Sequence, residues 1–267
     1  MTDACLLIDS HCHLDAESFA DPAAELAAAR AAGVTGLVVP AVLEPQWQRL
    51  AQLHRQFKSV QFALGVHPWW VTPATAAELS AFKGRLLQAA GELPCVAIGE
   101  SGVDGLRGPP LAVQAEWLAL HAEVAVALDK PLIVHAVRSH DTIQPILKRF
   151  RRQLRGVIHA FSGGPELARQ YWQAGFYLGI GGTITYARAS KTRRAVAELP
   201  LAALLLETDA PDMPLAGCQG QINRPQALAQ VASCLAELRG EPLATIAAAT
   251  RHNTEQLFGL QSAFSPE

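Results

Sequence analysis

The 267-residue sequence predicts an α/β protein, a (β/α)8 TIM barrel that forms a single domain over residues 1–267. Short apolar runs recur eight times along the chain, and segments of helical character separate them. The runs begin 20 to 36 residues apart, which is the length of a strand, a helix and their loops. A barrel of this kind typically has about 250 residues, so the chain is long enough for one.

The eight predicted strands are apolar on both alternating faces, as parallel strands must be when helices cover them. They occupy residues 6–9 continuing toward His11, and then residues 36–42, 61–66, 95–99, 131–134, 155–158, 175–180 and 203–206. The first helix has clear boundary signals: Asp21 as N-cap, Pro22 in the first turn and Gly33 at the end. Further helical segments cover residues 45–57, 75–90, 113–128, 142–154, 165–174, 190–198, 225–238 and 243–258.

An open, doubly wound sheet is the rival architecture for alternating strands and helices. Such a sheet normally carries a glycine-rich phosphate-binding turn after its first strand, and here the sequence SHCHLD occupies that place. The sequence has no internal repeat and no linker, which favours one domain.

Composition restricts the possible partners and the compartment. Lys and Arg number 22 against 24 Asp and Glu, so the chain as a whole offers no basic surface for a nucleic acid. The five cysteines are dispersed and have no CxxC spacing, which argues against a disulfide framework and favours the reducing cytoplasm. No apolar run approaches the roughly 18 residues that span a bilayer. We therefore expect a soluble protein with no membrane association and no obligate protein partner.

Polar residues with ligand or acid–base chemistry follow the predicted strands at their carboxyl ends. Six of the eight strand ends offer such a side chain, and barrel enzymes build their active sites at this end. The residues are His11, His13, His67, Glu100, His135, His159, Glu207 and Asp209.

The pair His11 and His13 points to a metal site. Residues two apart on an extended segment place their side chains on the same side. With Glu100, His135, His159 and Asp209, the set would bring four imidazoles and two carboxylates together, which is costly to bury without a cation. Six ligands exceed the capacity of a single zinc ion, so two divalent ions fit better. The ligand types suit zinc, manganese, nickel or iron, and also magnesium where a phosphate adds oxygens, so the identity of the metal stays open.

Nearly the whole chain resembles the TatD-type metal-dependent deoxyribonucleases of the amidohydrolase superfamily. The resemblance is carried by IDSHCHLD, GVHP, AIGESGVD, PLIVHAVR, HAFSG, LLLETDAPDMP and NRP. The stretches GIGGTITYARASKTR and LLLETDAPDMPLAGCQGQINRP are especially similar to the YjjV-type branch. The resemblance implies a hydrolase that cleaves phosphodiester bonds of DNA.

The resemblance also implies a ligand set. The positions that match the family's metal ligands assign His11, His13, Glu100 and Asp209 to one ion, and Glu100 as a bridge with His135 and His159 to the other. Two such ions would lower the pKa of a water, polarise a phosphoryl oxygen and neutralise the leaving oxygen. Glu100 and Asp209 are the catalytic candidates, together with Glu207, which lies two residues before Asp209 and faces the same way.

The sequence departs from the family pattern at two points. The family usually has His-x-Arg after the fifth strand, whereas here Val137 takes that place and Arg138 follows one residue later. A shift of one residue turns a strand side chain to the other face, so a phosphate contact by Arg138 requires the chain to have left the strand. Ser101 stands where the family usually has Ile after the glutamate, and Glu100 itself is kept.

Five residues are candidates for binding the substrate. A local group of cations can grip a few phosphates even on a slightly acidic protein. The candidates are His67, Arg138, Arg188, Lys191 and Arg224. The expected partner is DNA, as a single strand or a frayed end, with RNA as a further option.

Two other functions stay open at the level of sequence. One alternative is an amidohydrolase that uses the same metal centre on a small cyclic amide or ester. In those barrels the bridging anion often resembles a carbamylated lysine at the end of the fourth strand. No lysine follows the fourth strand here. The other alternative is a non-catalytic barrel that binds a metal or a nucleic acid. A full ligand set with a bridging carboxylate argues against it, since binding alone does not require one.

Overall fold

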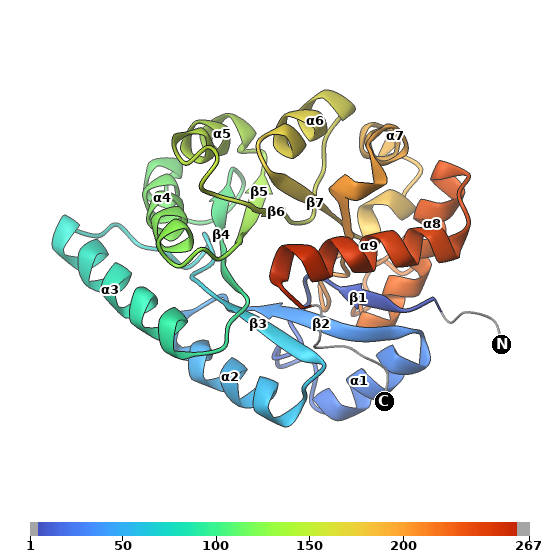
Figure 1. Ribbon diagram of the computed structural model, residues 1–267, viewed down its shortest axis with the longest axis horizontal. Coiled ribbons are helices and arrows are strands. Elements are labelled where there is room, and N and C mark those ends of the chain that lie inside the picture. The colour runs from blue at the N-terminus through green and yellow to red at the C-terminus, as the bar shows by residue number, and fades with distance from the viewer. Residues whose placement is uncertain (1–4, 261–267) are drawn as a thin grey trace. The chain divides into compact units, whose positions relative to one another are not determined.

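The computed structural model describes residues 5–260, and its eight strands alternate with helices along the chain (Figure 1). The strands are β1 (Leu7–Asp9), β2 (Val34–Pro40), β3 (Val60–Leu64), β4 (Ala97–Asp104), β5 (Leu132–Val137), β6 (Gly156–Ile158), β7 (Phe176–Ile180) and β8 (Leu204–Leu206). Their order in the sheet follows the chain from β1 to β8, and the registered pairs are parallel. This is the topology of the (β/α)8 barrel, so the predicted fold class is confirmed.

The helices begin and end largely where the sequence indicates. They are α1 (Pro22–Ala31), α2 (Trp47–Gln56), α3 (Ala76–Glu92), α4 (Leu111–Ala127), α5 (His140–Arg149), α6 (Pro165–Gln173), α7 (Ser190–Glu198), α8 (Leu228–Arg239) and α9 (Leu243–Phe258), with short 3-10 helices η1 (Glu44–Gln46), η2 (Gly182–Thr185), η3 (Leu201–Ala203) and η4 (Pro225–Ala227). The Asp21 side chain accepts hydrogen bonds from the amides of Ala23 and Ala24, as an N-cap does. Thr75 and Glu78 form a capping box at the start of α3.

The chain divides into two compact units. Unit 1 comprises residues 1–39, 159–173 and 177–267, and unit 2 comprises residues 40–158 and 174–176. Within the described part of unit 1, β7 pairs with β8, β1 pairs with β2, and the amide of Ser10 donates to the carbonyl of Leu206, which joins β1 to β8. In unit 2, β3, β4, β5 and β6 pair in that order. The single domain expected from the sequence stays a prediction.

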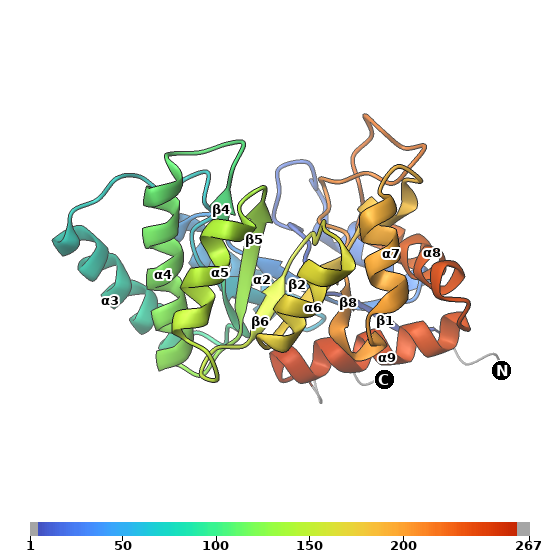
Figure 2. The same ribbon diagram turned by 90° about the horizontal axis from the view of Figure 1, so that it is seen from above.

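Helices cover the outer side of the strands within each unit. In unit 2, α4 packs on β4 and against α5, and both views show the two helices side by side (Figures 1 and 2). In unit 1, α9 packs against β8 and β1. All residues of β3 and β4 are buried, because one face of these strands meets helices and the other faces inward.

One strand differs from its predicted extent in a way that matters for the site. The sequence predicts a strand over residues 95–99, but β4 continues to Asp104 as its last residue. The register of β4 with β5 shifts between Ile98 and Ser101, so Glu100 lies at an irregularity inside the strand. The residues of β4 after Ile98 are partly polar, so a search for apolar runs does not predict that the strand continues.

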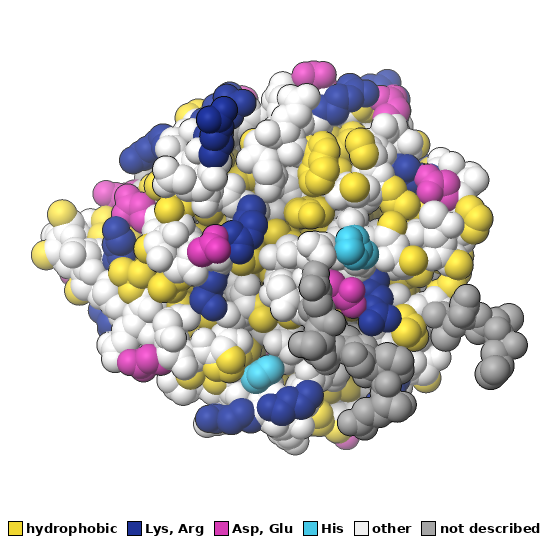
Figure 3. Space-filling model, viewed as in Figure 1, with side chains coloured by type: hydrophobic (Ala, Val, Ile, Leu, Met, Phe, Trp, Pro, Cys, Tyr) yellow, Lys and Arg dark blue, Asp and Glu magenta, His cyan; other side chains and the backbone are white. Residues whose placement is uncertain are grey.

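Two further expectations concern the surface and the cysteines. All five cysteines lie within residues 5–260 and are free, as their spacing predicts. No helix in that range is long and apolar enough to cross a bilayer. On the face shown in Figure 3, the Lys and Arg side chains of the described residues are scattered among hydrophobic and neutral ones rather than gathered in one stripe.

Candidate functional site

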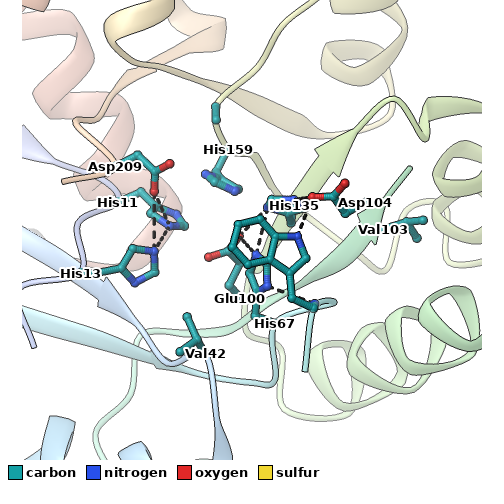
Figure 4. Close-up of polar contacts among 12 residues, drawn as sticks. His11, His13, Val42, His67, Glu100, Val103, Asp104, His135, His159 and Asp209 are labelled. Carbon is teal, nitrogen blue, oxygen red and sulfur yellow. Dashed lines mark hydrogen bonds and ion pairs between the residues drawn. The ribbon is translucent and has the colours of Figure 1, made fainter. Parts of the chain in front are cut away.

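The first cluster, in unit 1, consists of His11, His13 and Asp209. The two histidines follow β1, and the aspartate follows β8. Their side chains point toward one another (Figure 4): the Nε2 atoms of the histidines are 3.3 Å apart, and they lie 3.5 and 3.6 Å from Oδ1 of Asp209. His11 is fully buried, while the side chains of His13 and Asp209 keep 16% and 14% exposure. The predicted HxH pair and Asp209 are thus brought together.

Backbone hydrogen bonds between the segments after β1 and β8 hold the first cluster. The amide of Asp209 donates to the carbonyl of His11 at 2.9 Å, and the amide of His13 donates to the carbonyl of Ala210 at 2.8 Å. Asp209 itself adopts a left-handed conformation with φ of 56°. These two bonds fix the spacing of the ligand-bearing residues without using any side-chain atom.

Asp9 anchors the same two segments and was missed by the sequence analysis. Its Oδ1 accepts from the amides of His11 and Thr208 at 3.2 and 3.0 Å, and its Oδ2 accepts from Oγ1 of Thr208 at 2.6 Å. Burial raises the pKa of Asp9 to about 8, against the opposing effect of the bonds from Thr208. An acid at the end of a buried apolar strand is the signal that could have identified this residue.

His159 and Glu207, also in unit 1, lie next to the first cluster. The ring of His159 stacks on that of His11, with centroids 4.0 Å apart and planes inclined by 13°. Glu207 is buried, accepts a hydrogen bond from the amide of Ala160, and has Oε1 3.8 Å from Nδ1 of His159. A Cβ at Gly179 would come within 2.0 Å of Oε2 of Glu207, so the carboxylate occupies the space that the glycine leaves. Glu207 therefore contacts the segment that carries His159, which suits a positioning role.

The second cluster, in unit 2, consists of His67, Glu100 and His135. Oε1 of Glu100 lies 2.9 Å from Nδ1 of His135 and 3.3 Å from Nε2 of His67, and the two ring nitrogens are 3.2 Å apart (Figure 4). The three side chains are at most 9% exposed. The sequence argument places Glu100 and His135 at a metal and gives His67 a phosphate contact. The structure brings His67 beside both of them, and its contact with a phosphate stays a prediction.

A chain of hydrogen bonds behind the second cluster orients His135. Oδ2 of Asp104 lies 3.0 Å from Nε2 of His135 and accepts from Nε1 of Trp69 at 2.6 Å. Burial acts to raise the pKa of Asp104, but the bonds from His135 and Trp69 outweigh it and hold this pKa below its usual range. An ionised Asp104 favours the tautomer of His135 that carries its proton on Nε2. The unprotonated Nδ1, which faces Glu100, is then able to ligate a cation.

Both clusters fit a bound divalent cation. The donor atoms within each lie within 4.8 Å of one another. Two nitrogens bound to one tetrahedral zinc ion with bonds of roughly 2.0–2.1 Å lie about 3.3 Å apart, and the separations within the clusters run from 2.9 to 3.6 Å. Imidazole and carboxylate donors suit zinc, manganese and nickel. The prediction that Glu100 bridges two ions stays a prediction.

The remaining substrate candidates have different surroundings. Arg138 follows the end of β5, is exposed and adopts a φ of 47°, so the chain has left the strand there. Arg188 lies over the ring of Tyr186, and Lys191 is exposed in the first turn of α7. Arg224 forms an ion pair with Glu25 of α1, which holds part of its charge within unit 1.

Comparison with known sequences identifies relatives along nearly the whole chain. A family model described as TatD related DNase matches residues 8–259. The chain is 43% identical over 260 residues to the uncharacterized metal-dependent hydrolase YjjV of Escherichia coli K12, covering 96% of this chain and 99% of YjjV. It is 34% identical to an uncharacterized metal-dependent hydrolase of Haemophilus influenzae, covering 94% and 98%.

Comparison with solved structures agrees with the sequence relationships. The crystal structure of YjjV, a TatD homologue from Escherichia coli, matches with a TM-score of 0.88 at 42% identity and covers 96% of this chain and 99% of that one. The phosphotriesterase homology protein of Escherichia coli, at 16% identity and a TM-score of 0.69, covers 96% and 99% and shares the fold. The family match spans every residue of the first and second clusters. The chain therefore belongs to the TatD family of metal-dependent hydrolases.

Proposed function

We propose that the protein is a deoxyribonuclease that hydrolyses phosphodiester bonds at single-stranded or frayed DNA ends, using two divalent cations. The observation that carries the proposal is that each compact unit holds a group of three imidazole and carboxylate donors at mutual distances of 2.9 to 3.6 Å. The family match to TatD related DNase supports the choice of substrate. The five free cysteines suit a reducing compartment, and we propose the cytoplasm.

Residues of the two clusters hold the cations, and the charge state of Asp209 suits this role. When bound, divalent ions supply Lewis-acid charge that polarises a phosphoryl oxygen and acidifies the attacking water. In the first cluster, burial acts to raise the pKa of Asp209, but the bond from His13 and the neighbouring imidazoles outweigh it and keep this pKa below its usual value. Asp209 is then ionised at neutral pH, which is the state that a carboxylate needs to hold a cation beside His11 and His13.

The other acidic residues act on the positions of ligands. Glu100 presents Oε1 to both histidines of the second cluster, and Asp104 fixes the tautomer of His135. Glu207 accepts from the backbone beside His159 and so holds that ring on His11. The exposed side chains of Arg188 and Lys191 provide local positive charge for the phosphates of a strand.

Cleavage of labelled oligonucleotides tests the proposal. The full-length protein, loaded separately with Zn²⁺, Mn²⁺, Ni²⁺ and Mg²⁺, is incubated with single-stranded, blunt duplex and frayed duplex DNA, with matched RNA, and with a small cyclic amide and a lactone. We expect shortened DNA products that disappear with EDTA and are absent with Glu100→Gln. Turnover of the amide or lactone without any cleavage of DNA would overturn the assignment, as would tight DNA binding without EDTA-sensitive turnover.

A further inference from the structure

Unit 1 contains a pocket of about 220 Å³ between the segments that follow β7 and β8. This volume is below the roughly 300–1,000 Å³ of pockets that enclose a whole small ligand, so the pocket would hold only part of one, such as a single ring. Its lining combines apolar surface with one cation. The lining residues are Thr183, Tyr186, Arg188, Ala189, Met213 and Pro214.

Hydrogen bonds join the two walls of the pocket. Oη of Tyr186, after β7, donates to the carbonyl of Pro214, after β8, at 2.7 Å. Oγ1 of Thr185 accepts from the amide of Ala216 at 2.9 Å and donates to the carbonyl of Gly182 at 2.6 Å. The pocket is therefore formed before any ligand enters, which lowers the entropic cost of binding.

Arg188 places an accessible cation at this pocket. Its guanidinium carbon lies 4.6 Å from the centroid of the Tyr186 ring, and its side chain is exposed. Within residues 5–260 no ion pair neutralises it, whereas Arg224 pairs with Glu25 and Arg193 donates to the carbonyl of Ile184 at 2.5 Å. The exposed guanidinium carries N–H donors that suit two parallel bonds to a phosphate.

The pocket shares a segment with the first cluster. Met213 in its wall comes four residues after Asp209, and between them the amide of Asp212 donates to the carbonyl of Asp209 at 2.8 Å, which closes a turn. A molecule in the pocket would therefore lie beside the segment that supplies a cation ligand. A substrate held there would extend toward the reacting centre.

We propose that this pocket is a nucleotide subsite, in which the base lies against the apolar surface of Met213 and Pro214 and the phosphate is bound by Arg188. The inference rests on the proposed function, because the nucleotide bound here is the unit next to the bond that is cleaved. The subsite would bind its nucleotide in the absence of the cations.

Binding of thymidine 5′-monophosphate to the full-length protein in EDTA, measured by calorimetry, tests the subsite. Thymidine and inorganic phosphate serve as the partial ligands. We expect Arg188→Gln to weaken binding of the monophosphate about tenfold, which corresponds to the loss of a charge-assisted phosphate contact. The matched control is Arg30→Gln, which removes the same charge from an exposed arginine in the last turn of α1 and should change binding less than about twofold. Met213→Ala should weaken thymidine as well as the monophosphate.

Kinetics on an oligonucleotide separate this inference from the proposed activity. Arg188→Gln should raise KM about tenfold with little change in kcat, since the contact is made equally in the ground and transition states. Equal effects of Arg188→Gln and Arg30→Gln, or inorganic phosphate binding as tightly as the monophosphate, would overturn the subsite. Arg188-dependent binding of the monophosphate by a protein that cuts no DNA would retain the subsite and overturn the nuclease. Cleavage of DNA by Arg188→Gln with an unchanged KM would retain the nuclease and overturn the subsite.

Discussion

The first and second clusters present similar donor atoms but are supported in different ways. In the first, backbone bonds between the segments after β1 and β8 set the positions of His11, His13 and Asp209, and two of the side chains remain partly exposed. In the second, the donors are at most 9% exposed, and the side chains of Asp104 and Trp69 orient His135. The second cluster should therefore be more sensitive to changes in side chains that never touch a cation.

The largest expected effect follows from Glu100→Gln. The substitution removes the negative charge of the second cluster while keeping the shape of the side chain, so kcat/KM for an oligonucleotide should fall about 10³-fold. Circular dichroism should show an unchanged fold. Glu116→Gln, at an exposed position on α4, is the matched control and should retain the parent rate.

Asp209→Asn tests whether the clusters bind cations independently. It leaves the backbone bonds of the first cluster in place but removes its carboxylate, and activity should fall about 10²-fold. Elemental analysis after gel filtration should show the loss of one bound ion, with the ion of the second cluster retained. Loss of both ions would show that the two clusters depend on each other and would contradict independent binding of the cations.

Asp104→Asn tests whether the second cluster depends on a side chain that does not ligate the cation. Because the amide no longer favours the proton of His135 on Nε2, the affinity of the second cluster for a cation should fall about 10- to 100-fold. Competition with a fluorescent chelator measures this affinity, and ¹⁵N chemical shifts of His135 report the tautomer. Trp69→Phe, which removes one donor to Asp104 but keeps its charge, should have a smaller effect. An equal loss at the first cluster would refute the assignment.

A further expected effect concerns the pH dependence of the stability of unit 2. Burial lowers the pKa of His121 to about 4, and the neutral ring accepts from the amide of Val66 at 3.1 Å, next to His67. In the unfolded chain the pKa is about 6.5. Above pH 6.5 both states hold neutral His121, so this contribution to stability is complete, and it is lost as the pH falls from 6.5 to 4.

Titration of unfolding measures that contribution. The free energy of unfolding should decrease by about 2–3 kcal/mol from this residue between pH 7 and pH 4. His121→Gln should be less stable than the parent at pH 7 and should lack this component of the pH dependence. A parent and variant with parallel pH profiles would show that His121 takes up its proton without a cost to the fold.

The sequence predicts the fold class well because a barrel strand is defined locally. Apolar runs with helical segments between them mark the eight strands. The rule that site residues lie near the carboxyl end of a strand selects His11, His13, His135 and Asp209 as candidates. The position of β4 was harder to predict. Its polar second half is paired to β5, and that pairing depends on residues more than thirty positions away.

The surroundings of individual side chains could not be predicted for the same reason. His67 meets Glu100 and His135 only through the fold of unit 2, and no pattern near GVHP distinguishes a donor group from a phosphate contact. The pairing of Arg224 with Glu25 joins residues 199 positions apart. Long-range partners of this kind decide whether a charge is available to a substrate, and local spacing contains no information about them.

The close approach of Gly179 to Glu207 has an implication for how these proteins diversify. A Cβ at position 179 would collide with Oε2 of Glu207, so a side chain there requires the carboxylate of Glu207 to move or to be replaced. An alanine there becomes admissible once the acid is shortened by one methylene to aspartate, which would also withdraw it from the amide of Ala160. Relatives with a side chain at position 179 should therefore lack the contact between residue 207 and the backbone beside His159.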